Sequence, residues 1–359
     1  MLVPVALSIL LSGVLSGSAT LTRRATTCNG FSELCDRSYG NVSFVGAHDS
    51  YAVGTNNLAV NQDYDVTQQL TDGVRLLQMQ ALNNSGTIQL CHTSCLLFNG
   101  GTLQDYLTKV KTWMDANPND VVTLLIVNIN NLAPSLFGDV FSNVGLDKVS
   151  YAPKNSTTAF TDWPTLGSMI DSGTRLVTFL DNQADLTSVP YLLDEFTNVW
   201  ETPFDVTTEF DCSVNRTKGD SSTQMYLINH FLDMVVLGNP APNVGAANVT
   251  NSLSGTNSLG AQVDLCVAQY SRPPNFLLVD FYEYGGGSVF QEAANLNGVT
   301  YSPTTPIAQP KSTSSSASGS GQSGGSTTTG NGNGAISGSH GVASLLVALS
   351  VLLGAFTVV

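Results

Sequence analysis

The sequence predicts a single-domain α/β protein built as a (β/α)8 TIM-type barrel. Its central part, residues 28–300, has the usual length of such a barrel. Short apolar runs of the kind that form buried parallel strands recur along it, and helical stretches lie between several of them. This alternation is typical of a parallel sheet. An open, doubly wound sheet is the competing fold, but no Gly-x-Gly-x-x-Gly motif follows a strand to support a nucleotide site.

The elements follow from local patterns. The clearest helix begins after Thr102, a good N-cap residue, and carries apolar residues three and four positions apart as far as Met114. It ends at the turn cluster Asn117-Pro118-Asn119-Asp120. The predicted parallel strands are residues 43–47, 74–79, 88–90, 121–127, 175–180, 225–228 and 276–280.

The first residues of the chain predict export. Residues 1–19 are typical of a secretory signal peptide, because an apolar run is followed by the small residues Gly17-Ser18-Ala19. The dibasic pair Arg23-Arg24 resembles a processing site, which predicts a propeptide that ends at residue 24.

The last residues predict a membrane tether. Residues 301–341 form a linker rich in Ser, Gly and Thr, a disordered stalk that cannot bury enough apolar surface to offset its ordering entropy. Residues 342–359 are apolar and uncharged, whereas a transmembrane anchor usually carries Lys or Arg on its cytoplasmic side. A GPI-attachment signal fits this order better, with Asn331 or Asn333 as the attachment residue. We therefore expect an extracellular protein held at the plasma membrane or cell wall.

Cysteines and sequons agree with an oxidising, extracellular compartment. The six cysteines are an even number, and proximity along the chain favours the pairs Cys28–Cys35, Cys91–Cys95 and Cys212–Cys266. The sequence contains no Cys-x-x-Cys pair, so it gives no indication of a zinc site. The formal charge of −14 argues against nucleic acid as a partner. N-glycosylation sequons start at Asn41, Asn83, Asn155, Asn215 and Asn248.

Polar side chains follow the predicted strands where the strands end. His48 and Asp49 come after the first apolar run, and His92 comes after the third. In a barrel, the carboxyl ends of the strands meet at one mouth, which is where active sites form. Two histidines at such a mouth suggest a general base and a general acid, because imidazole exchanges protons near neutral pH. Other strand ends carry Gln78, Gln80, Asn128, Asp181, His230 and Asp280.

Three segments carry a resemblance to a known family. Phe44-Val45-Gly46-Ala47-His48-Asp49-Ser50-Tyr51, then Asp72-Gly73-Val74-Arg75-Leu76-Leu77-Gln78, then Ile88-Gln89-Leu90-Cys91-His92 resemble the X-domain of phosphatidylinositol-specific phospholipases C. More narrowly, they are similar to the secreted fungal phospholipase-C-like phosphodiesterases. The resemblance covers residues 40–130 and, more loosely, the chain to residue 285. It implies a TIM-type barrel and chemistry on a phosphodiester or phospholipid-like substrate.

The resemblance implies roles for the histidines. His48 matches the general base that takes a proton from the attacking hydroxyl, and His92 matches the general acid that protonates the leaving oxygen. Asp49, or a carboxylate on a later strand, would hold His48 in the required tautomer, and Asp280 is the candidate. A simple strand-end cap is the alternative for Asp280.

The sequence departs from the family where a phosphate clamp is expected. Bacterial members carry an acidic residue and an arginine on this strand, and calcium-dependent members carry carboxylates; here these places hold Gln78 and Gln80. Asn128 stands where the others have a lysine or a glutamate. Hard cations need anionic oxygen ligands, so no metal or other cofactor is expected. The amides would cradle the phosphate instead, while Arg75 is expected to point into the helix layer.

Further candidates for substrate contact are less specific. Asp181 and His230 end predicted strands, although a buried, hydrogen-bonded histidine explains His230 equally well. Tyr282 belongs to an aromatic stretch that would line either a substrate pocket or the barrel rim.

The sequence supports three functional hypotheses. The first is a secreted, GPI-anchored phospholipase-C-like phosphoric diester hydrolase that forms a cyclic phosphate and needs neither a metal nor an obligate protein partner. The second is a catalytically weakened or inactive barrel that acts as a cell-surface or cell-wall binding protein, motivated by the neutral residues at the clamp positions. The third is a glycoside hydrolase, which needs two facing carboxylates from among Asp181, Asp280 and Glu283.

Overall fold

The computed structural model describes residues 24–55 and 57–311. The predicted signal peptide, the GPI tail and its attachment residues Asn331 and Asn333 lie outside the described residues. The described residues all belong to one compact unit. Within the described part, no helix has the length and apolar character needed to cross a bilayer.

Eight parallel strands form the centre of the molecule and follow one another around it in chain order. Neighbouring strands are hydrogen-bonded along the path β7-β6-β5-β2-β1-β12-β9-β8. The first and last strands in sequence meet in the middle of this path, where Phe44–Ala47 pairs with Phe276–Val279 residue by residue. The strands are β1 Phe44–Ala47, β2 Leu76–Asn84, β5 Val122–Asn128, β6 Leu176–Leu180, β7 Leu192–Asp194, β8 Val199–Glu201, β9 Met225–His230 and β12 Phe276–Val279.

The predicted barrel is therefore confirmed, with one open seam. No hydrogen-bonded pairing joins β7 to β8 among the described residues, and only the four-residue helix α5 separates them along the chain. The sequence does not reveal these two strands, because three residues each are too few for a periodic pattern. Trp200 in β8 is fully buried, as a barrel strand requires.

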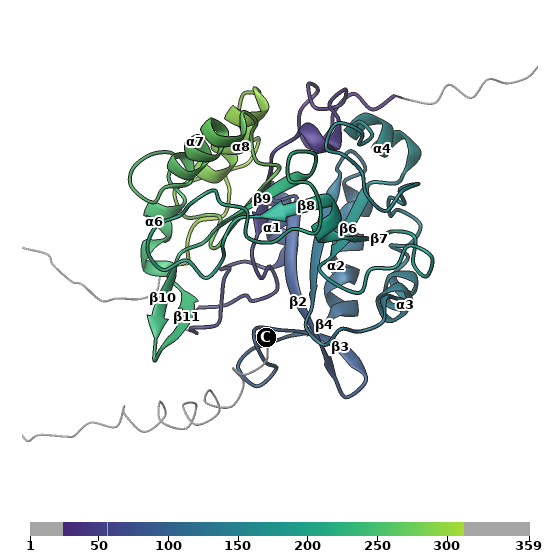
Figure 1. Cartoon of the computed structure of the whole chain (residues 1–359), viewed down its shortest axis with the longest axis horizontal. Helices are drawn as coiled ribbons and strands as arrows, with labels where there is room; N and C mark the ends of the chain where they lie inside the picture. Colours follow the sequence, from purple (N-terminus) through teal and green to yellow (C-terminus); the bar gives the residue numbers. More distant parts are fainter. Residues whose placement is uncertain (1–23, 56, 312–359) are drawn as a thin grey trace, which may run out of the picture. The chain divides into compact units, whose positions relative to one another are not determined.

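Helices cover the outside of the curled sheet, although not after every strand. Figure 1 shows α2, α3 and α4 on one side and α6, α7 and α8 on the other. Thr102 caps α2 by accepting a hydrogen bond from the Asp105 backbone N–H, as its N-cap position predicts. The helices are η1 Tyr39–Asn41, α1 Val66–Asp72, α2 Leu103–Ala116, α3 Pro134–Val144, α4 Leu166–Ser172, α5 Glu195–Asn198, η2 Val244–Ala246, α6 Ala247–Thr250, α7 Leu259–Tyr270 and α8 Ser288–Asn297.

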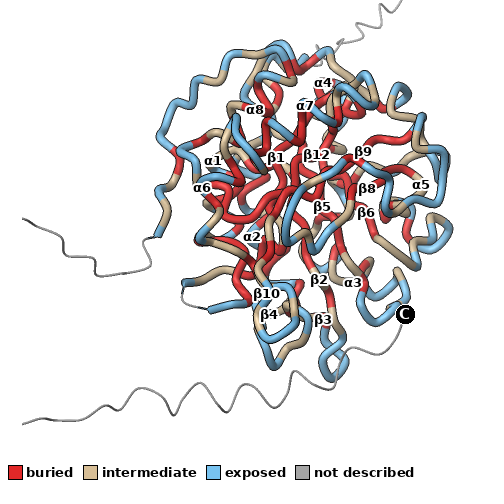
Figure 2. The backbone as a smooth tube through the Cα atoms, turned by 60° about the vertical axis from the view of Figure 1, so that its left-hand side comes forward, coloured by how far each residue is buried: buried red, intermediate tan, exposed pale blue. Residues whose placement is uncertain are grey.

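Alternation along the strands separates two apolar cores. Phe44, Leu125 and Phe179 belong to the cluster inside the barrel, which extends over the base formed by residues 28–42. Val45 and Leu124 belong to the larger cluster between the sheet and its helices. Figure 2 shows these buried strands at the centre of the molecule, enclosed by exposed loops.

Two antiparallel additions extend beyond the carboxyl ends of the barrel strands. The strand Thr87–Cys91 (β3), predicted as a parallel barrel strand, instead returns antiparallel to the long end of β2 and pairs with β4, Asn99–Thr102. The second addition is the hairpin of β10, Asp233–Val236, and β11, Asn239–Pro242.

The cysteines and the C-terminal segment complete the domain. Disulfides join Cys28–Cys35, Cys91–Cys95 and Cys212–Cys266, the pairs that proximity along the chain predicts. After α8 the chain returns as a strap, which we define as residues 299–311. Tyr301 of the strap stacks on Phe290 of α8, and Ile307 is buried.

Candidate active site

His48 lies directly beyond the end of β1, next to the end of β12. Its backbone N–H donates to the carbonyl of Val279, continuing the parallel ladder between the two strands. This register places the His48 ring beside the Asp280 carboxylate, with 2.9 Å between Nδ1 and Oδ1. Among the carboxylates considered in the sequence, Asp280 is thus the one that binds Nδ1 and leaves Nε2 facing the mouth.

His92 reaches the same place from the β2–β3 hairpin. The hairpin carries the chain beyond the barrel and back, and the Cys91–Cys95 disulfide closes the turn that contains His92. Its Nδ1 lies 2.9 Å from the carbonyl oxygen of Ala59. A carbonyl only accepts, so Nδ1 carries a proton and Nε2 is left for substrate.

Both imidazoles converge on Asp49. The His48 Nε2 lies 3.8 Å from Asp49 Oδ2, and the His92 Nε2 lies 3.6 Å from the same oxygen. The side chain of Asp49 is fully buried, while the two imidazole side chains remain about one-sixth exposed. The two Nε2 atoms therefore face a common, partly accessible space above one buried carboxylate.

Gln78 and Gln80 hold Asp49 in this position. The side-chain oxygen of Gln78 accepts from the Asp49 backbone N–H at 2.7 Å. The Gln80 amide donates to Asp49 Oδ2 at 2.8 Å, while its oxygen accepts from the backbone N–H of Thr93. Both amides are on the expected face of β2, and these hydrogen bonds show that they orient Asp49.

The backbone turns sharply directly after each of the three reactive groups. Asp49, Thr93 and Phe281, which follow His48, His92 and Asp280, have φ values of 37°, 60° and 45°. Left-handed conformations at residues other than glycine cost energy and persist where surrounding contacts enforce them, which is common at functional sites. These turns end the strands while the preceding side chains stay directed toward the mouth.

Neighbouring carboxylates raise the pKa of His48. Burial alone lowers the pKa of His48, but the carboxylates of Asp280 and Asp49 outweigh burial and raise it to about 9. Burial raises the pKa of the Asp280 carboxyl, and the neighbouring His48 opposes this increase. The pair is best described as an imidazolium bound to a carboxylate at neutral pH, so the basic form of His48 becomes abundant only under alkaline conditions.

The structure adds residues that sequence reasoning missed. Phe231 stacks on the His48 ring at 3.7 Å between centroids and 4° between planes. Burial, with Asp280 nearby, raises the pKa of Asp233 to about 7. Arg216 binds Glu201 at the end of β8 and lies over Phe204 on the opposite wall of the barrel. None of these belongs to a short motif, so only three-dimensional placement identifies them.

Three predicted substrate contacts are not at the mouth as expected. Asn128 uses its amide to bridge the backbone of Leu132, so it shapes the β5–α3 loop and cannot cradle phosphate. His230 is fully buried, and its two ring nitrogens face Gln262 and the carbonyl of Thr250 on the outer side of the sheet. Tyr282 is also fully buried, and its hydroxyl donates to Asp72 in the outer layer and not toward the mouth.

The other predicted residues lie at the mouth, in the helix layer or on the surface, as expected from the sequence. Asp181 ends β6 at the mouth, where its carboxylate accepts hydrogen bonds from the Asn128 backbone and the Asn182 amide. Arg75 points into the helix layer, binds Asp120 and lies over Trp113, as the pleat predicts. The sequon residues Asn41, Asn83, Asn155, Asn215 and Asn248 are all exposed.

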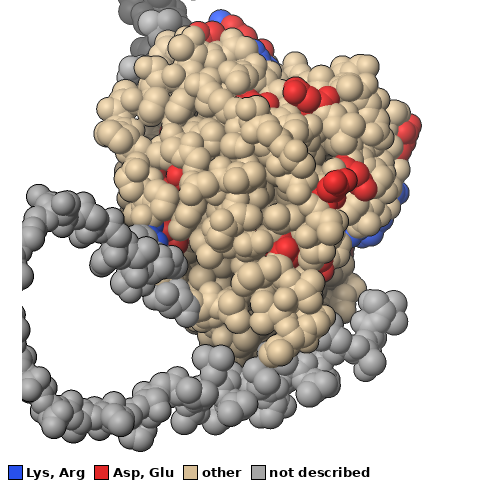
Figure 3. Space-filling model, turned by 90° about the vertical axis from the view of Figure 1, so that its left-hand side faces the viewer, with Lys and Arg blue, Asp and Glu red and all other residues tan. Residues whose placement is uncertain are grey.

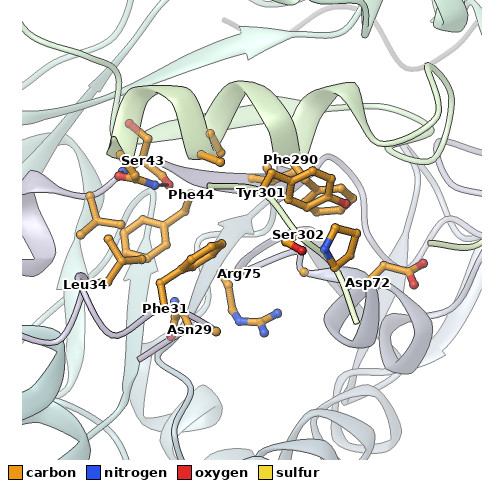
Figure 4. Close-up of a pocket in the computed structure, with 18 of the residues that line it drawn as sticks. Asn29, Phe31, Leu34, Ser43, Phe44, Asp72, Arg75, Phe290, Tyr301 and Ser302 are labelled. Atoms are coloured by element: carbon orange, nitrogen blue, oxygen red, sulfur yellow. Dashed lines mark hydrogen bonds between the residues drawn. The ribbon is translucent and has the colours of Figure 1, made fainter. Parts of the chain in front are cut away.

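A cavity of about 250 Å³ lies at the other end of the barrel. Figure 4 shows Phe31, Phe44, Phe290 and Tyr301 around it, with the Arg75 side chain at its edge. The Arg75 guanidinium is already engaged by Asp120 and by backbone carbonyls. The Asp72 carboxylate in its lining is likewise bound, by the Gln68 amide, the Tyr282 hydroxyl and the Ala308 backbone N–H. The paired histidines at the mouth are therefore the better candidates for the chemistry.

Comparison with known proteins identifies the class. The PI-PLC X family model, described as PI-PLC X 1, matches residues 34–297, and the chain belongs to this family. A PI-PLC X domain-containing protein 1 of Arthroderma benhamiae is 45% identical over 82% of this chain and 96% of its own length. An uncharacterized secreted protein of the same fungus is 46% identical over 80% of this chain and 70% of its own.

Solved structures show the same fold. The phosphatidylinositol-specific phospholipase C of Listeria monocytogenes superposes with a TM-score of 0.51 at 16% identity, covering 73% of this chain and 95% of that one. At this identity the likeness concerns the barrel alone. The family and the fold together support a phospholipase-C-like phosphodiesterase.

Proposed function

We propose that the protein is an exported phosphoric diester hydrolase of the phospholipase C type that uses His48 as general base and His92 as general acid. The observation that carries the proposal is the convergence of both Nε2 atoms, at 3.8 and 3.6 Å, on Asp49 Oδ2 at the barrel mouth. A phosphodiester placed between the rings would have one imidazole near its attacking hydroxyl and one near its leaving oxygen.

The proton transfers follow from the hydrogen bonds. The His48 Nδ1–H donates to Asp280, so a deprotonated Nε2 accepts the proton of a neighbouring substrate hydroxyl. That oxygen attacks phosphorus and forms a cyclic phosphate as the bond to the leaving alcohol breaks. His92, whose Nδ1–H is held by Ala59, donates the Nε2 proton to the leaving oxygen when it is an imidazolium. Asp49 stabilises the charge on both rings.

The rim of the mouth suits a phospholipid-like substrate. Apolar side chains are exposed in three loops beyond the strand ends: Leu58 at 56%, Leu96 at 85% and Leu237 at 65%. Figure 3 shows few charged side chains over the lower part of one face, toward the end that bears the β10–β11 hairpin. Exposed apolar side chains around a site indicate contact with an apolar partner, and the surface of a lipid layer supplies one.

Export and GPI attachment are part of the proposal. Three disulfides and five exposed sequons are consistent with an extracellular domain. One relative is itself called a secreted protein. The apolar residues 342–359 supply the attachment signal. Mass spectrometry of the protein recovered from membranes should find a C-terminus near Asn331 or Asn333, and an intact C-terminus would refute the anchor.

The activity is tested on purified protein with soluble phosphodiesters and with phospholipid vesicles, each with and without EDTA. We expect turnover that is insensitive to EDTA and, on diesters with an alkyl leaving group, a loss of about 10²- to 10⁴-fold in His48→Ala and in His92→Ala. Arg75→Lys, far from the mouth, is the control. Equal activity in His48→Ala and wild type would refute the mechanism. No turnover on any diester would favour a barrel retained only for binding at the cell surface.

A further inference from the structure

One short loop touches both imidazoles. We define it as the support loop, residues 59–62, between β1 and α1. At its start, the carbonyl of Ala59 faces the His92 Nδ1 at 2.9 Å. Two residues later, the side-chain nitrogen of Asn61 lies 3.2 Å from the His48 Nδ1. Because β1 and the β2–β3 hairpin carry the two histidines separately, this loop contacts both rings on their Nδ1 side, while Asp49 faces both on their Nε2 side.

Asn61 binds the partner of His48 directly. Its amide nitrogen lies 3.1 and 3.2 Å from the two carboxylate oxygens of Asp280. The His48 Nδ1–H already donates to Asp280, so the Asn61 N–H groups donate to the carboxylate and not to the ring. Asn61 is fully buried, which makes the amide a fixed donor with no competing water.

The support loop is fastened on both sides. The Gln62 amide donates to the carbonyls of His48 and Val279, joining the ends of β1 and β12, and the Asn61 carbonyl accepts from the Phe281 backbone N–H. The next two residues bind the strap: Asp63 accepts from the backbone N–H of Lys311, and the Tyr64 hydroxyl donates to the carbonyl of Gln309. Movement of the loop would therefore disturb the ends of both β1 and β12.

We propose that Asn61 is a positioning residue for the reaction: it holds the Asp280 carboxylate in line with His48 while the Ala59 carbonyl fixes the tautomer of His92. This inference rests on the proposed function. With the donor removed, the Asp280 carboxylate loses two hydrogen bonds and binds the His48 proton more tightly, so the base is harder to free. The His48–Asp280 alignment also loosens, and small misplacements of a catalytic group are costly.

The test is Asn61→Leu, which keeps the volume and removes the donor. We expect kcat to fall about 10- to 100-fold with KM changed less than about threefold. On a nitrophenyl diester, whose leaving group needs no proton from His92, the acid limb of the kcat/KM profile reports His48 and should move to higher pH by about half a unit to one unit. The other carboxylates facing His48, namely Asp49, Asp233 and Asp205, are unchanged in this variant, so the shift reports the Asp280 contact. Asn61→Ser, which keeps a donor, should restore part of both effects.

Asn198→Leu is the matched control, because Asn198 is an equally buried amide that bonds only to Ser156, Thr158, Asp194 and Thr197. It should lower the melting temperature without moving the pH limb. Asn61→Leu would overturn the proposal if it lost activity with the limb in its wild-type place. Imidazole ¹⁵N spectra give a readout independent of turnover. The supporting result in wild type is a single Nδ1-protonated state of His92 and, above about pH 9, a single Nδ1-protonated state of His48. His48 should instead exchange between tautomers in Asn61→Leu. This result supports the proposal even if no diester is cleaved, and identical spectra of the two proteins contradict it.

Discussion

Replacement of Asp280 by Asn gives a large predicted change in the pH dependence of activity. In the wild-type protein, burial lowers the pKa of His48, and Asp280 and Asp49 raise it from its ordinary value of 6.5 to about 9. At 1.36 kcal/mol per unit, this net shift corresponds to about 3 kcal/mol in favour of the imidazolium. Asp280 is the first of the carboxylates that cause it, through its charge and a 2.9 Å hydrogen bond.

Without the Asp280 charge, burial has less opposition and the pKa of His48 should fall by about 2 units. The pH dependence of kcat/KM should therefore shift to lower pH in Asp280→Asn. On a nitrophenyl diester, whose leaving group needs no proton from His92, kcat/KM of the wild type should rise with pH to about 9, because His48 must lose its proton to act as a base. In Asp280→Asn, that rise should be complete near neutral pH. The plateau should also be lower by about 10²-fold or more, since an amide oxygen holds the tautomer without stabilising the imidazolium.

The assay is a kcat/KM profile from about pH 5 to about pH 10 on that soluble nitrophenyl diester, with thermal melts to confirm folding. Asp233→Asn serves as a comparison, because Asp233 also faces His48 but makes no hydrogen bond to it. Its limb should move in the same direction by less than half as much. An Asp280→Asn limb that coincides with the wild-type limb would refute the assignment of His48 as the base.

Two further predictions concern the rim and the hairpin turn. Leu96→Asp combined with Leu237→Asp should lower the rate on phospholipid vesicles about tenfold or more and leave soluble diesters unaffected, because both side chains are exposed at the rim. An equal loss on both substrates would contradict a docking role. Cys91→Ser with Cys95→Ser should lower the free energy of unfolding by about 2 kcal/mol, as expected for a short closed loop. Denaturant titration measures this change, and an unaltered kcat in the same variant would show that the disulfide does not help to place His92.

The sequence was most informative where chemistry and strand pattern coincide. His48 and Asp280 each follow a four-residue buried strand, and the pairing of those strands explains why two groups so far apart in sequence meet. Periodicity also located α2 and its cap. The family resemblance rests on residues 44–51, 72–78 and 88–92, which include the strand that carries His48, and it led to the correct barrel.

The predictions that were wrong, and the residues that were missed, also have physical explanations. An apolar run does not encode strand direction, so β3 looked like a barrel strand although it is antiparallel. His230 follows a buried strand as His48 does, but alternation along β9 turns its side chain toward α7 instead of the mouth. Asn61 lies in an irregular loop, where no spacing relates it to Asp280, 219 residues away. Its role depends on closure of the sheet between β1 and β12.

The most direct test of the account compares leaving groups. An alkyl alcohol needs a proton as it departs, whereas nitrophenolate leaves readily without one. If His92 is the general acid, His92→Ala should lose about 10²-fold or more in kcat/KM on an alkyl diester and much less on the nitrophenyl diester, while His48→Ala should lose activity on both. Equal losses on the two leaving groups in His92→Ala would contradict the pairing of base and acid across Asp49.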